Sequence, residues 1–342
     1  MNRRKFLSSS LKGIATLPFT NLIEAKEERI EKRNEERIII SGAGDVTLGF
    51  NFPYMFNKIS ELNGVDNAYE YPFLNVRNVF ENSDLSLVNL EGALTNSDKI
   101  RPKKFNFKGD PSYARCLNEG NIDIVNLANN HFMDYSEEGA LETIGSLNSH
   151  NVKYCGGGTN ENDSSSLKVI NRKGINVGFL GFAQVGRYPP AGKSSAGTNP
   201  FDNNLWDKIE NSKDNCDILV VSCHWGIERN SYPEKYQIRD ARKFIDSGAD
   251  IVFGHHPHVI QGIEKYNGGI IFYSLGNFIF GGNSFPSDRD SFIAQVECSK
   301  NKVESYNIIP VITHPSSMVF QPYIPLPENQ DKITDKIKMR SM

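Results

Sequence analysis

Short apolar runs recur along the chain between residues 37 and 285, and segments with helical periodicity separate several of them. The runs cover residues 37–40, 85–90, 122–127, 175–182, 218–222, 251–253 and 270–275. Each is short enough to form a buried strand, whereas the apolar residues of segments 137–150 and 233–247 return at helical spacing. This alternation is typical of an α/β protein with a continuous sheet in its core.

Side chains that can bind a metal or move a proton follow five of these runs. They are Asp45, Glu91, the segment Asn129–His131, His224 and the histidines at 255, 256 and 258. A single polar residue at such a position is usually a cap or a turn former. Five in succession are hard to explain in that way, and ligands in open α/β sheets gather outside the carboxyl ends of the strands. We therefore expect these side chains to meet at one site.

Three of the seven histidines, His255, His256 and His258, lie within four positions directly after the apolar run 251–253. Pro257 prevents a regular helix there, so the imidazoles are expected on a loop at the end of a strand. A His-x-His pair can place both rings on one side of an extended loop, and neutral imidazole is a common metal ligand. The alternative is a cluster of surface histidines with no function, but the pattern favours metal or phosphate chemistry.

The donor set combines carboxylates, an amide oxygen and imidazoles. The five cysteines are scattered and include no CxxC pair, so neither a zinc–thiolate site nor a disulfide framework is indicated. Mixed oxygen and nitrogen donors suit divalent Mn, Fe, Zn or Co. Two such ions held by a shared carboxylate clamp the oxygens of a phosphoryl ester and lower the pKa of a bound water. Hydrolysis of a phosphoester or phosphoanhydride is therefore the expected reaction class.

Six ordered motifs resemble those of the CapA (PgsA-like) family of bacterial capsule proteins. They are GDVTLG at 44–49, NLEG at 89–92, ANNHFMDYSEEG at 128–139, CHWG at 223–226, GHHPHVIQ at 254–261 and YSLGNF at 273–278. The family is associated with poly-γ-glutamate capsule synthesis and belongs to the calcineurin-like metallophosphoesterase superfamily. The resemblance covers residues 37–312 and implies a metallophosphoesterase-like αββα sandwich, in which two packed mixed sheets are flanked by helices.

The resemblance also implies ligands for one or two divalent ions, with Mn, Fe or Zn as the expected metals. Asp45 would bind the first ion, and Glu91 stands where the superfamily carries a bridging aspartate. Asn130 would bind the second ion through its side-chain oxygen. The implied imidazole ligands are His224, His256 and His258.

His131 is implied as the general acid, or as the group that stabilises the transition state over the phosphoryl oxygen, and Asp134 joins it as a catalytic residue. The ring nitrogens of the ligand histidines that face away from the metal need hydrogen-bond partners. The candidates for that role are Asp134, Asn129 and Gln261. His255 is expected to support the ligands or to pack against them rather than to be one.

Two further residues have both a functional and a packing interpretation. Trp225 beside His224 could stack on a substrate, although a large aromatic residue at a strand end more often packs in the core. Asn277 follows a predicted strand and a glycine turn, from which its side chain could reach the site.

Two departures from the superfamily pattern leave the activity open. Thr47 stands two residues after Asp45, where the superfamily usually has a histidine, and Glu91 is one methylene longer than the usual aspartate. The leading interpretation is a metal-dependent hydrolase with a phosphoesterase-type site, acting in capsule or poly-γ-glutamate biosynthesis. The alternative is a non-catalytic accessory protein that binds poly-γ-glutamate or the synthase complex through a degenerate metal site. An exported nucleotidase is disfavoured, because no second, base-stacking domain is evident.

The N-terminus resembles an export signal. Arg3 and Arg4 precede a Ser-rich, mildly apolar stretch, so residues 1–25 are similar to a twin-arginine signal, and residues 26–36 form a charged linker. We therefore expect an extracytoplasmic protein, in the periplasm or at the cell surface, with membrane association left open.

The C-terminal third predicts two features. Residues 292–311 alternate as a β-hairpin that completes the second sheet of the domain at 37–312. Residues 313–342 are the predicted C-terminal tail, and their part 322–342, which is Pro-rich and then Lys-rich, is expected to be loosely attached.

Charge limits the partners. A net charge of -3 and a pI near 6.2 give no general electrostatic reason to expect nucleic acid. The family resemblance implies instead an anionic surface polymer or its phosphorylated precursor, and membrane-bound polyglutamate synthase subunits.

Overall fold

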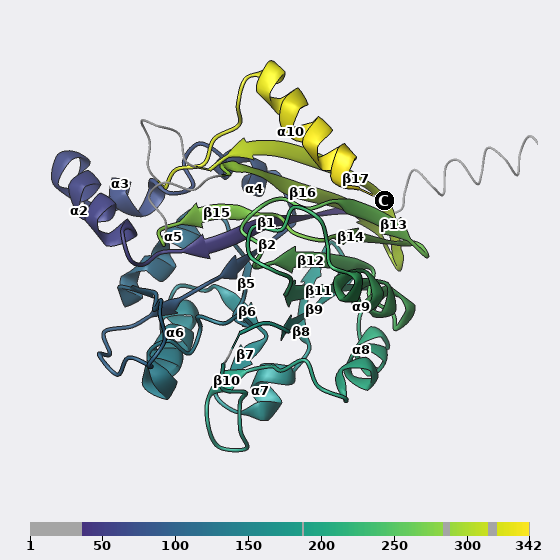
Figure 1. The fold of residues 1–342 in the computed structure, drawn as a ribbon, viewed down its shortest axis with the longest axis horizontal. Coiled ribbons are helices and arrows are strands. Elements are labelled where there is room, and N and C mark those ends of the chain that lie inside the picture. Colours follow the sequence, from purple (N-terminus) through teal and green to yellow (C-terminus); the bar gives the residue numbers. More distant parts are fainter. Residues whose placement is uncertain (1–35, 187, 283–287, 314–319, 342) are drawn as a thin grey trace, which may run out of the picture. The chain divides into compact units, whose positions relative to one another are not determined.

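Two mixed β-sheets lie face to face in the structure, a computed structural model that describes residues 36–186, 188–282, 288–313 and 320–341 (Figure 1). The chain from Arg37 onward forms one compact unit. The predicted export signal and all of the predicted linker except its last residue lie outside the described residues.

The first sheet is organised around β1 (Ile38–Thr47), which is parallel to β2 (Leu85–Leu90) and antiparallel to β16 (Asp290–Ser299). Its strand order is β17-β16-β1-β2-β5-β6, and β15 pairs with the end of β1 in parallel. The remaining strands are β5 (Ile124–Asn126), β6 (Lys153–Cys155), β15 (Asn277–Phe280) and β17 (Lys302–Ile312). Because β1 is central, the polar residues at its carboxyl end lie inside the fold.

The second sheet has the strand order β13-β14-β12-β11-β9-β8. Its inner strands are parallel, and the edge strands β8 and β13 run antiparallel to their neighbours. The strands are β8 (Lys168–Arg172), β9 (Ile175–Ala183), β11 (Ile218–His224), β12 (Ile251–His255), β13 (Ile263–Tyr266) and β14 (Gly269–Phe272). The last residues of β11 and β12, His224 and His255, are directly paired, so both strands deliver imidazoles to the same edge.

Alternating side chains from both sheets fill the space between them. Ile38 and Ile40 of β1 belong to the same buried cluster as Val220 of β11 and Phe253 of β12. Residues two apart on a strand face the same side, so each strand gives one apolar face to this core. Gly42 continues that face of β1, and a Cβ there would lie 2.6 Å from the Phe253 ring, so the glycine permits the sheets to approach closely.

Helices cover the outer face of each sheet. Val88 of β2 packs with Phe52 and Ile144 on one side, and Leu219 of β11 packs with Phe244 on the other. The helices are α2 (Phe52–Asn63), α5 (Ala114–Glu119) and α6 (Ser136–Ser149) on the first sheet, and α8 (Leu205–Lys213) and α9 (Lys235–Asp246) on the second. The predicted fold class, two packed mixed sheets flanked by helices, is therefore confirmed.

Shorter elements lie in the connections. They are α3 (Val65–Glu70), α4 (Arg77–Glu81), α7 (Glu161–Ser165), a 3-10 helix (Pro111–Tyr113), the strand pair β3 (Ala93–Leu94) and β4 (Lys108–Gly109), and the pair β7 (Gly157–Gly158) and β10 (Gly197–Thr198). Among the helices in the described ranges, none combines the length and the apolar character that crossing a bilayer requires.

The predicted C-terminal hairpin is present as β16 and β17. The sequence predicted that it completes the second sheet, but β16 pairs with β1, so the hairpin extends the first sheet. The physical reason is that β1 offers a free edge on the side away from β2, and the apolar face of β16 continues the core between the sheets.

The C-terminal segment is attached more firmly than the predicted loose tail. Helix α10 (Pro327–Arg340) buries Ile333 and Ile337 in the core between the sheets. The Arg340 guanidinium at its end donates a 2.6 Å hydrogen bond to the carbonyl oxygen of Ile260. Loose attachment is therefore wrong for the described part of this segment, because two isoleucines four positions apart form an apolar helical face.

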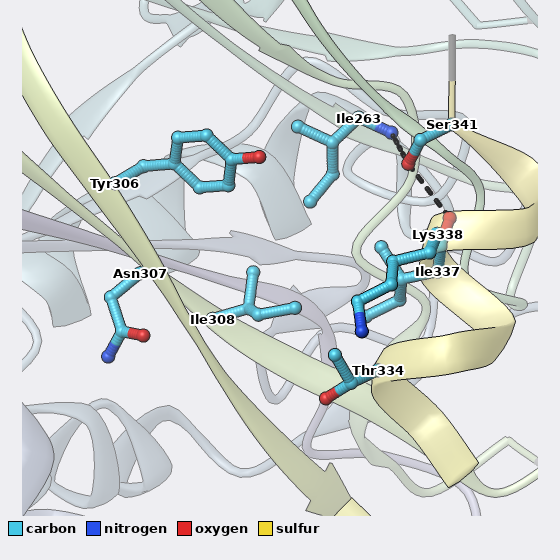
Figure 2. Close-up of a pocket in the computed structure, with 8 residues that line it drawn as sticks. All are labelled: Ile263, Tyr306, Asn307, Ile308, Thr334, Ile337, Lys338 and Ser341. Carbon is cyan, nitrogen blue, oxygen red and sulfur yellow. Dashed lines mark hydrogen bonds between the residues drawn. The ribbon is translucent and has the colours of Figure 1, made fainter. Parts of the chain in front are cut away.

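A pocket of about 570 Å³ lies between α10 and the strands β13 and β17 (Figure 2). The Ser341 hydroxyl lies at one end, where it donates to the Ile337 carbonyl oxygen (2.8 Å) and accepts from the Ile263 backbone N–H (2.9 Å). The lining residues are Ile263, Tyr306, Asn307, Ile308, Thr334, Ile337, Lys338 and Ser341. None of the predicted ligands or catalytic residues is among them, so this pocket does not belong to the candidate site.

Candidate metal centre

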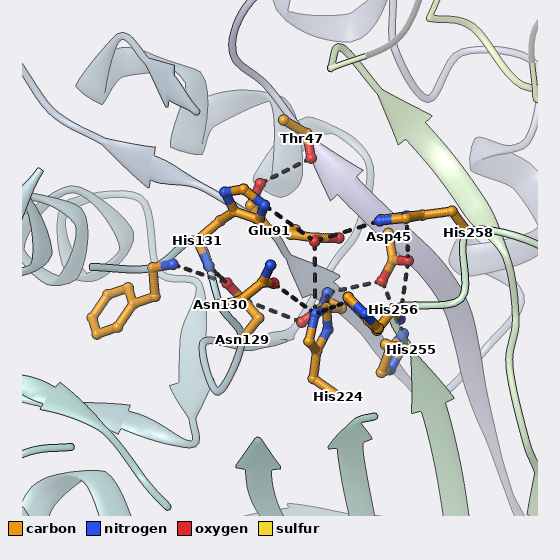
Figure 3. A network of polar contacts seen from close by, with 12 residues as sticks. Asp45, Thr47, Glu91, Asn129, Asn130, His131, His224, His255, His256 and His258 are labelled. Atoms are coloured by element: carbon orange, nitrogen blue, oxygen red, sulfur yellow. Dashed lines mark hydrogen bonds and ion pairs between the residues drawn. The ribbon is translucent and has the colours of Figure 1, made fainter. Parts of the chain in front are cut away.

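The carboxyl ends of β1, β2, β5, β11 and β12 meet at one place, where the polar side chains that end or follow these strands gather (Figure 3). Asp45 and Glu91 come from the first sheet, and His224 and His256 come from the second. All four side chains are buried. The expected convergence of separate strand ends is therefore present.

Glu91 lies at the centre of this group. Its carboxylate is fully buried, and neither oxygen has a hydrogen-bond partner among the described residues. Three imidazole Nε2 atoms surround Oε1, at 3.6 Å for His224, 3.8 Å for His258 and 3.9 Å for His131. Burial raises the pKa of Glu91 well above its ordinary value, and the nearby Asp45 adds to the shift while His258 opposes it. A buried carboxylate without a partner is rare and costly, and a bound cation would satisfy it.

Asp45, in contrast, is well supplied with partners. Its Oδ1 accepts a 2.8 Å hydrogen bond from the Asn89 amide, and its Oδ2 accepts one of 3.3 Å from the His256 backbone N–H. His258 Nδ1 lies 3.2 Å from Oδ2. Burial by itself raises the pKa of Asp45, but the His255 and His258 imidazoles hold it well below its usual range. Asp45 is therefore a carboxylate kept ionised in a buried position.

Two sets of buried or nearly buried side chains have the spacing of a metal site. Glu91, His224 and His256 form one set, and Asp45, Glu91 and His258 form the other. Within each set the ligand atoms lie within 4.8 Å of one another. Glu91 belongs to both, as a bridging ligand must. The donors are oxygen and imidazole nitrogen, so the residues fit divalent Mn, Fe or Zn.

Asn130 extends the first of these sets. Its side-chain Oδ1 lies 2.8 Å from Nε2 of His224, on the loop that follows β5. His256 Nδ1 lies 3.1 Å from the same nitrogen. Three predicted metal ligands, Asn130, His224 and His256, therefore have ligand atoms that face one another.

The histidine loop has an unusual backbone. His256 and His258 have positive φ values of 95° and 57°, a conformation that residues with a Cβ seldom adopt. Such strain persists only where surrounding contacts hold it, and it is frequent at functional sites. Here the His256 backbone N–H is bonded to Asp45, and the His258 carbonyl oxygen accepts from the Asn277 amide at 3.3 Å. The strained loop aims both rings at the carboxylates.

The imidazoles differ in protonation. Burial lowers the pKa of His256 to about 3 and that of His224 well below its ordinary value, and in both cases a neighbouring imidazole adds to the effect. Burial acts in the same direction on His258, but the carboxylates of Glu91 and Asp45 outweigh it and raise its pKa to about 9. His224 and His256 are thus neutral at neutral pH, with lone pairs available to a metal.

His131 and Asp134 form a hydrogen-bonded pair beside Glu91. His131 Nδ1 lies 2.7 Å from Asp134 Oδ2, and because a carboxylate only accepts, Nδ1 carries the proton. The other ring nitrogen, Nε2, faces Glu91. Burial lowers the pKa of His131, and Asp134 opposes that shift. The Phe107 ring lies against the imidazole, with 4.2 Å between ring centroids.

Asn129 shapes the turn that carries His131, although the sequence suggested it as a partner for an imidazole. Its Oδ1 accepts from the backbone N–H groups of His131 (3.0 Å) and Phe132 (2.9 Å), and its Nδ2 donates to the Leu90 carbonyl oxygen (2.8 Å). The side chain therefore bonds to main-chain groups and, at 3.2 Å, to the Asn89 side-chain oxygen, rather than to a ring nitrogen.

Gln261 and Trp225 lie away from the centre, although Gln261 was a predicted partner for a ring nitrogen. The Gln261 amide donates to the carbonyl oxygens of Asn230 (2.9 Å) and Tyr232 (3.1 Å), so it fixes a neighbouring loop rather than an imidazole. Trp225 is fully buried in the core beneath α9, and its indole N–H donates to the Tyr273 carbonyl oxygen at 2.9 Å. The packing interpretation of Trp225 is the correct one.

Asn277 and His255 both reach the site. Asn277 pairs with Asp45 across β15 and β1, and its Oδ1 lies 3.0 Å from Nδ1 of His258. His255 is fully buried with its Nδ1 3.5 Å from Asp45 Oδ1, and within the described ranges neither of its ring nitrogens has a hydrogen-bond partner. His255 thus contacts a predicted ligand but belongs to neither of the two metal-spaced sets.

Two residues of the site carried no sequence prediction of a role. Asn89 donates to Asp45 and lies 3.2 Å from His224 Nδ1, and its position near the end of β2, two residues before Glu91, was the available signal. Lys103 donates from Nζ to Asp134 Oδ1 at 2.7 Å. No motif marks Lys103, which lies in a loop that joins β3 to β4.

Comparison with known proteins identifies relatives of the chain. Residues 39–282 match the family model described as bacterial capsule synthesis protein PGA_cap. The PGA biosynthesis protein CapA of Bacillus subtilis is 30% identical, over 100% of this chain and 87% of that protein. The capsule biosynthesis protein CapA of Bacillus anthracis is 29% identical, over 82% of this chain and 69% of that protein. A solved structure, a hypothetical protein from Thermus thermophilus, aligns with a TM-score of 0.47 at 14% identity, over 80% of this chain and 98% of that one.

Proposed function

The chain belongs to the bacterial capsule synthesis protein family PGA_cap, and from this premise we propose that it is a metal-dependent hydrolase with a phosphoesterase-type site. The observation that carries the proposal is Glu91, a buried carboxylate that has no hydrogen-bond partner in the described part of the chain and is shared by two metal-spaced sets. The reaction would serve capsule or poly-γ-glutamate biosynthesis, the process named for the Bacillus relatives.

The residues that would hold the ions are divided between the two sets. Asp45, Glu91 and His258 would hold one ion, and Glu91, His224 and His256 with Asn130 Oδ1 would hold the other. Divalent ions bound there would polarise a phosphoryl oxygen and lower the pKa of a bound water. Mn, Fe and Zn all suit these donors.

His131 would move the proton. Asp134 holds the Nδ1–H, so the ring is fixed with Nε2 toward Glu91 and toward any group bound beside it. From Nε2 the neutral imidazole can take a proton from water, and the ring protonated in this way can give one to the leaving oxygen. The Phe107 ring shields the other side of the imidazole, which keeps competing water away from it.

Hydrolysis of a simple phosphodiester after loading with Mn²⁺ or Zn²⁺ tests the proposal. A positioned acid or base contributes roughly 10²- to 10⁴-fold, so His131→Ala should lose about that much rate. His150→Ala is the matched control, because His150 lies at the end of α6 and its Nδ1 bonds to the Ser146 carbonyl oxygen. Equal rates for His131→Ala and the parent would reject the hydrolase.

The alternative is a non-catalytic accessory protein, and Thr47 is the observation that favours it. The Thr47 hydroxyl donates to the Glu91 carbonyl oxygen at 2.8 Å, so this position gives no imidazole to the Asp45 set. A site with fewer donors could bind an anionic polymer such as poly-γ-glutamate, or a synthase subunit, without hydrolysing it. In that case a chelator abolishes polymer binding, and no metal restores any hydrolysis.

We also propose that the protein acts outside the cytoplasm, close to a membrane-bound polyglutamate synthase. The support is the Arg3-Arg4 pair ahead of a Ser-rich apolar stretch. Replacing both arginines with lysine should leave the protein in the cytoplasm, as fractionation of the producing cells would measure. Unchanged export of that variant would rule out the twin-arginine route.

A further inference from the structure

A basic loop, residues 101–107, is docked on the turn that carries His131 and Asp134. The Arg101 backbone N–H donates to the Asp134 carbonyl oxygen at 2.8 Å, and the Phe107 backbone N–H donates to Asp134 Oδ2 at 2.8 Å. The Phe107 ring also covers the His131 imidazole. Both ends of the basic loop, Arg101 and Phe107, are therefore bonded to Asp134 in this turn.

Lys103 makes the central contact of the basic loop. Its ammonium donates to Asp134 Oδ1 and to the Asn130 carbonyl oxygen, each at 2.7 Å, and lies 3.2 Å from His131 Nδ1. An ammonium has three donors, so a single side chain can fix two oxygens of the same turn. Asp134 is almost fully buried, whereas the Lys103 side chain retains 25% exposure.

Each oxygen of the Asp134 carboxylate has its own hydrogen-bond donors. Oδ1 is held by Lys103, and Oδ2 accepts from Phe107 N–H and from the His131 imidazole. Without the ammonium, the carboxylate would lose the contact that fixes its orientation. The direction of the imidazole depends on that orientation, because Asp134 is its hydrogen-bond acceptor.

We propose that Lys103 is a positioning residue of the site. It locks Asp134 so that Oδ2 faces His131 and Nε2 of the ring faces Glu91, and it holds the main chain of Asn130, whose side chain belongs to the metal centre. Lys103 thus acts on the metal centre through Asp134 and through a backbone carbonyl, not as a ligand. The part of this inference that concerns rate rests on the proposed hydrolase, whereas the part that concerns geometry does not.

Proton NMR of the full-length, metal-free protein tests the geometry without any need for activity. The proton on His131 Nδ1, bonded to a buried carboxylate, should give a distinct downfield signal that His131→Gln identifies by its loss. Lys103→Met should shift or broaden that signal, and Lys103→Arg, which keeps the cation, should retain it. Lys103→Gln serves as the second variant if Lys103→Met does not fold.

Lys108→Met is the matched control. Lys108 lies close by in the same segment, its side chain has a similar exposure of 29%, and its ammonium bonds to Asp98 and the Ser97 carbonyl oxygen instead of the turn. In Lys108→Met the signal of the His131 Nδ1 proton should equal that of the parent. The same signal in Lys103→Met and Lys108→Met would overturn the inference.

Kinetics distinguish a positioning role of Lys103 from a role in stability alone. Supporting residues around a metal site typically change activity or affinity by about 10- to 100-fold, so kcat should fall by that factor in Lys103→Met while KM changes little. Lys103→Arg should recover most of the loss, and Lys108→Met should show none. Absence of hydrolysis in the parent would reject the proposed hydrolase alone, since the NMR comparison still decides the role of Lys103. A rise in KM together with the fall in kcat, with no recovery in Lys103→Arg, would overturn the positioning role of Lys103.

Discussion

Thr47 Oγ1 donates a 2.8 Å hydrogen bond to the backbone carbonyl oxygen of Glu91. This bond ties the end of β1 to the residue that follows β2, and both groups are buried. Thr47 therefore links the two segments that carry the central carboxylates.

Thr47→Val should destabilise the protein without removing metal. The change leaves the Glu91 carbonyl oxygen without this donor, which costs about 1–3 kcal/mol in the free energy of unfolding. Urea denaturation measures that loss, and elemental analysis should find the same number of ions per chain as in the parent. A variant that loses an ion would place the hydroxyl among the ligands.

Glu91→Gln should release every bound ion, because Glu91 belongs to both metal-spaced sets. His224→Ala, which changes only one set, should release one. In a chelator, however, Glu91→Gln should melt at a higher temperature than the parent, since it replaces a buried carboxylate that has no hydrogen-bond partner among the described residues. Elemental analysis and thermal unfolding measure the two effects, and retention of two ions by Glu91→Gln would contradict the shared-ligand arrangement.

His255 and His256 should respond differently to the same substitution. His256→Gln should lose one ion, whereas His255→Gln should keep the parent's metal content, because His255 lies outside both sets and contacts Asp45 from the side. Isothermal titration with Zn²⁺ of the chelator-treated proteins measures this difference. Equal losses for the two variants would make His255 a ligand.

The stability of the metal-free protein should depend on pH through His258. Its pKa is raised from 6.5 to about 9 in the folded state, so the folded protein binds this proton more tightly than the unfolded chain does. The resulting stabilisation is fully present below pH 6.5 and is lost as the pH rises through 9. In a chelator, the melting-temperature difference between the parent and His258→Gln should shrink over that interval, and a difference that is constant with pH would show that the ring is not charged.

The C-terminal helix should contribute to the stability of the whole domain. Ile333→Ala and Ile337→Ala each remove a side chain that is buried in the core between the sheets, at a cost of roughly 2–5 kcal/mol. Met339→Ala is the control, because this side chain is 73% exposed and its loss should change the free energy of unfolding by less than about 0.5 kcal/mol. Small effects at both isoleucines would restore the prediction of a loose tail.

The strands of both sheets were predictable, because strands that are buried on both faces consist mostly of apolar residues. The runs at 85–90 and 218–222 consist mostly of apolar residues, and they become β2 and β11. The helix α9 was predictable from its spacing, and the Glu234 and Gln237 capping box marks its start. Helix α10 was missed, because lysines and acidic residues surround Ile333 and Ile337 and obscure their four-residue spacing.

The candidate site was predictable only where the residues stand at strand ends. Asp45 and His256 follow apolar runs, so topology alone brings them to one edge of the sheets. Lys103 lies 31 positions before Asp134 in a loop without periodicity, and a contact of that kind leaves no pattern in one sequence. For Gln261 the sequence predicted a role that the structure does not show. It lies within the histidine motif, but its side chain bonds to the loop at Asn230 rather than to an imidazole.

The hydrogen bond from the His256 backbone to Asp45 joins residues 211 positions apart. Folding must pass through that long-range contact, which forms slowly because much of the chain must first be ordered. The ligand atoms thus have no common location in a nascent or unfolded chain, and an ion can join them only after the two sheets have docked. The compartment in which folding ends, and not the donor set alone, would then decide which metal such a site acquires.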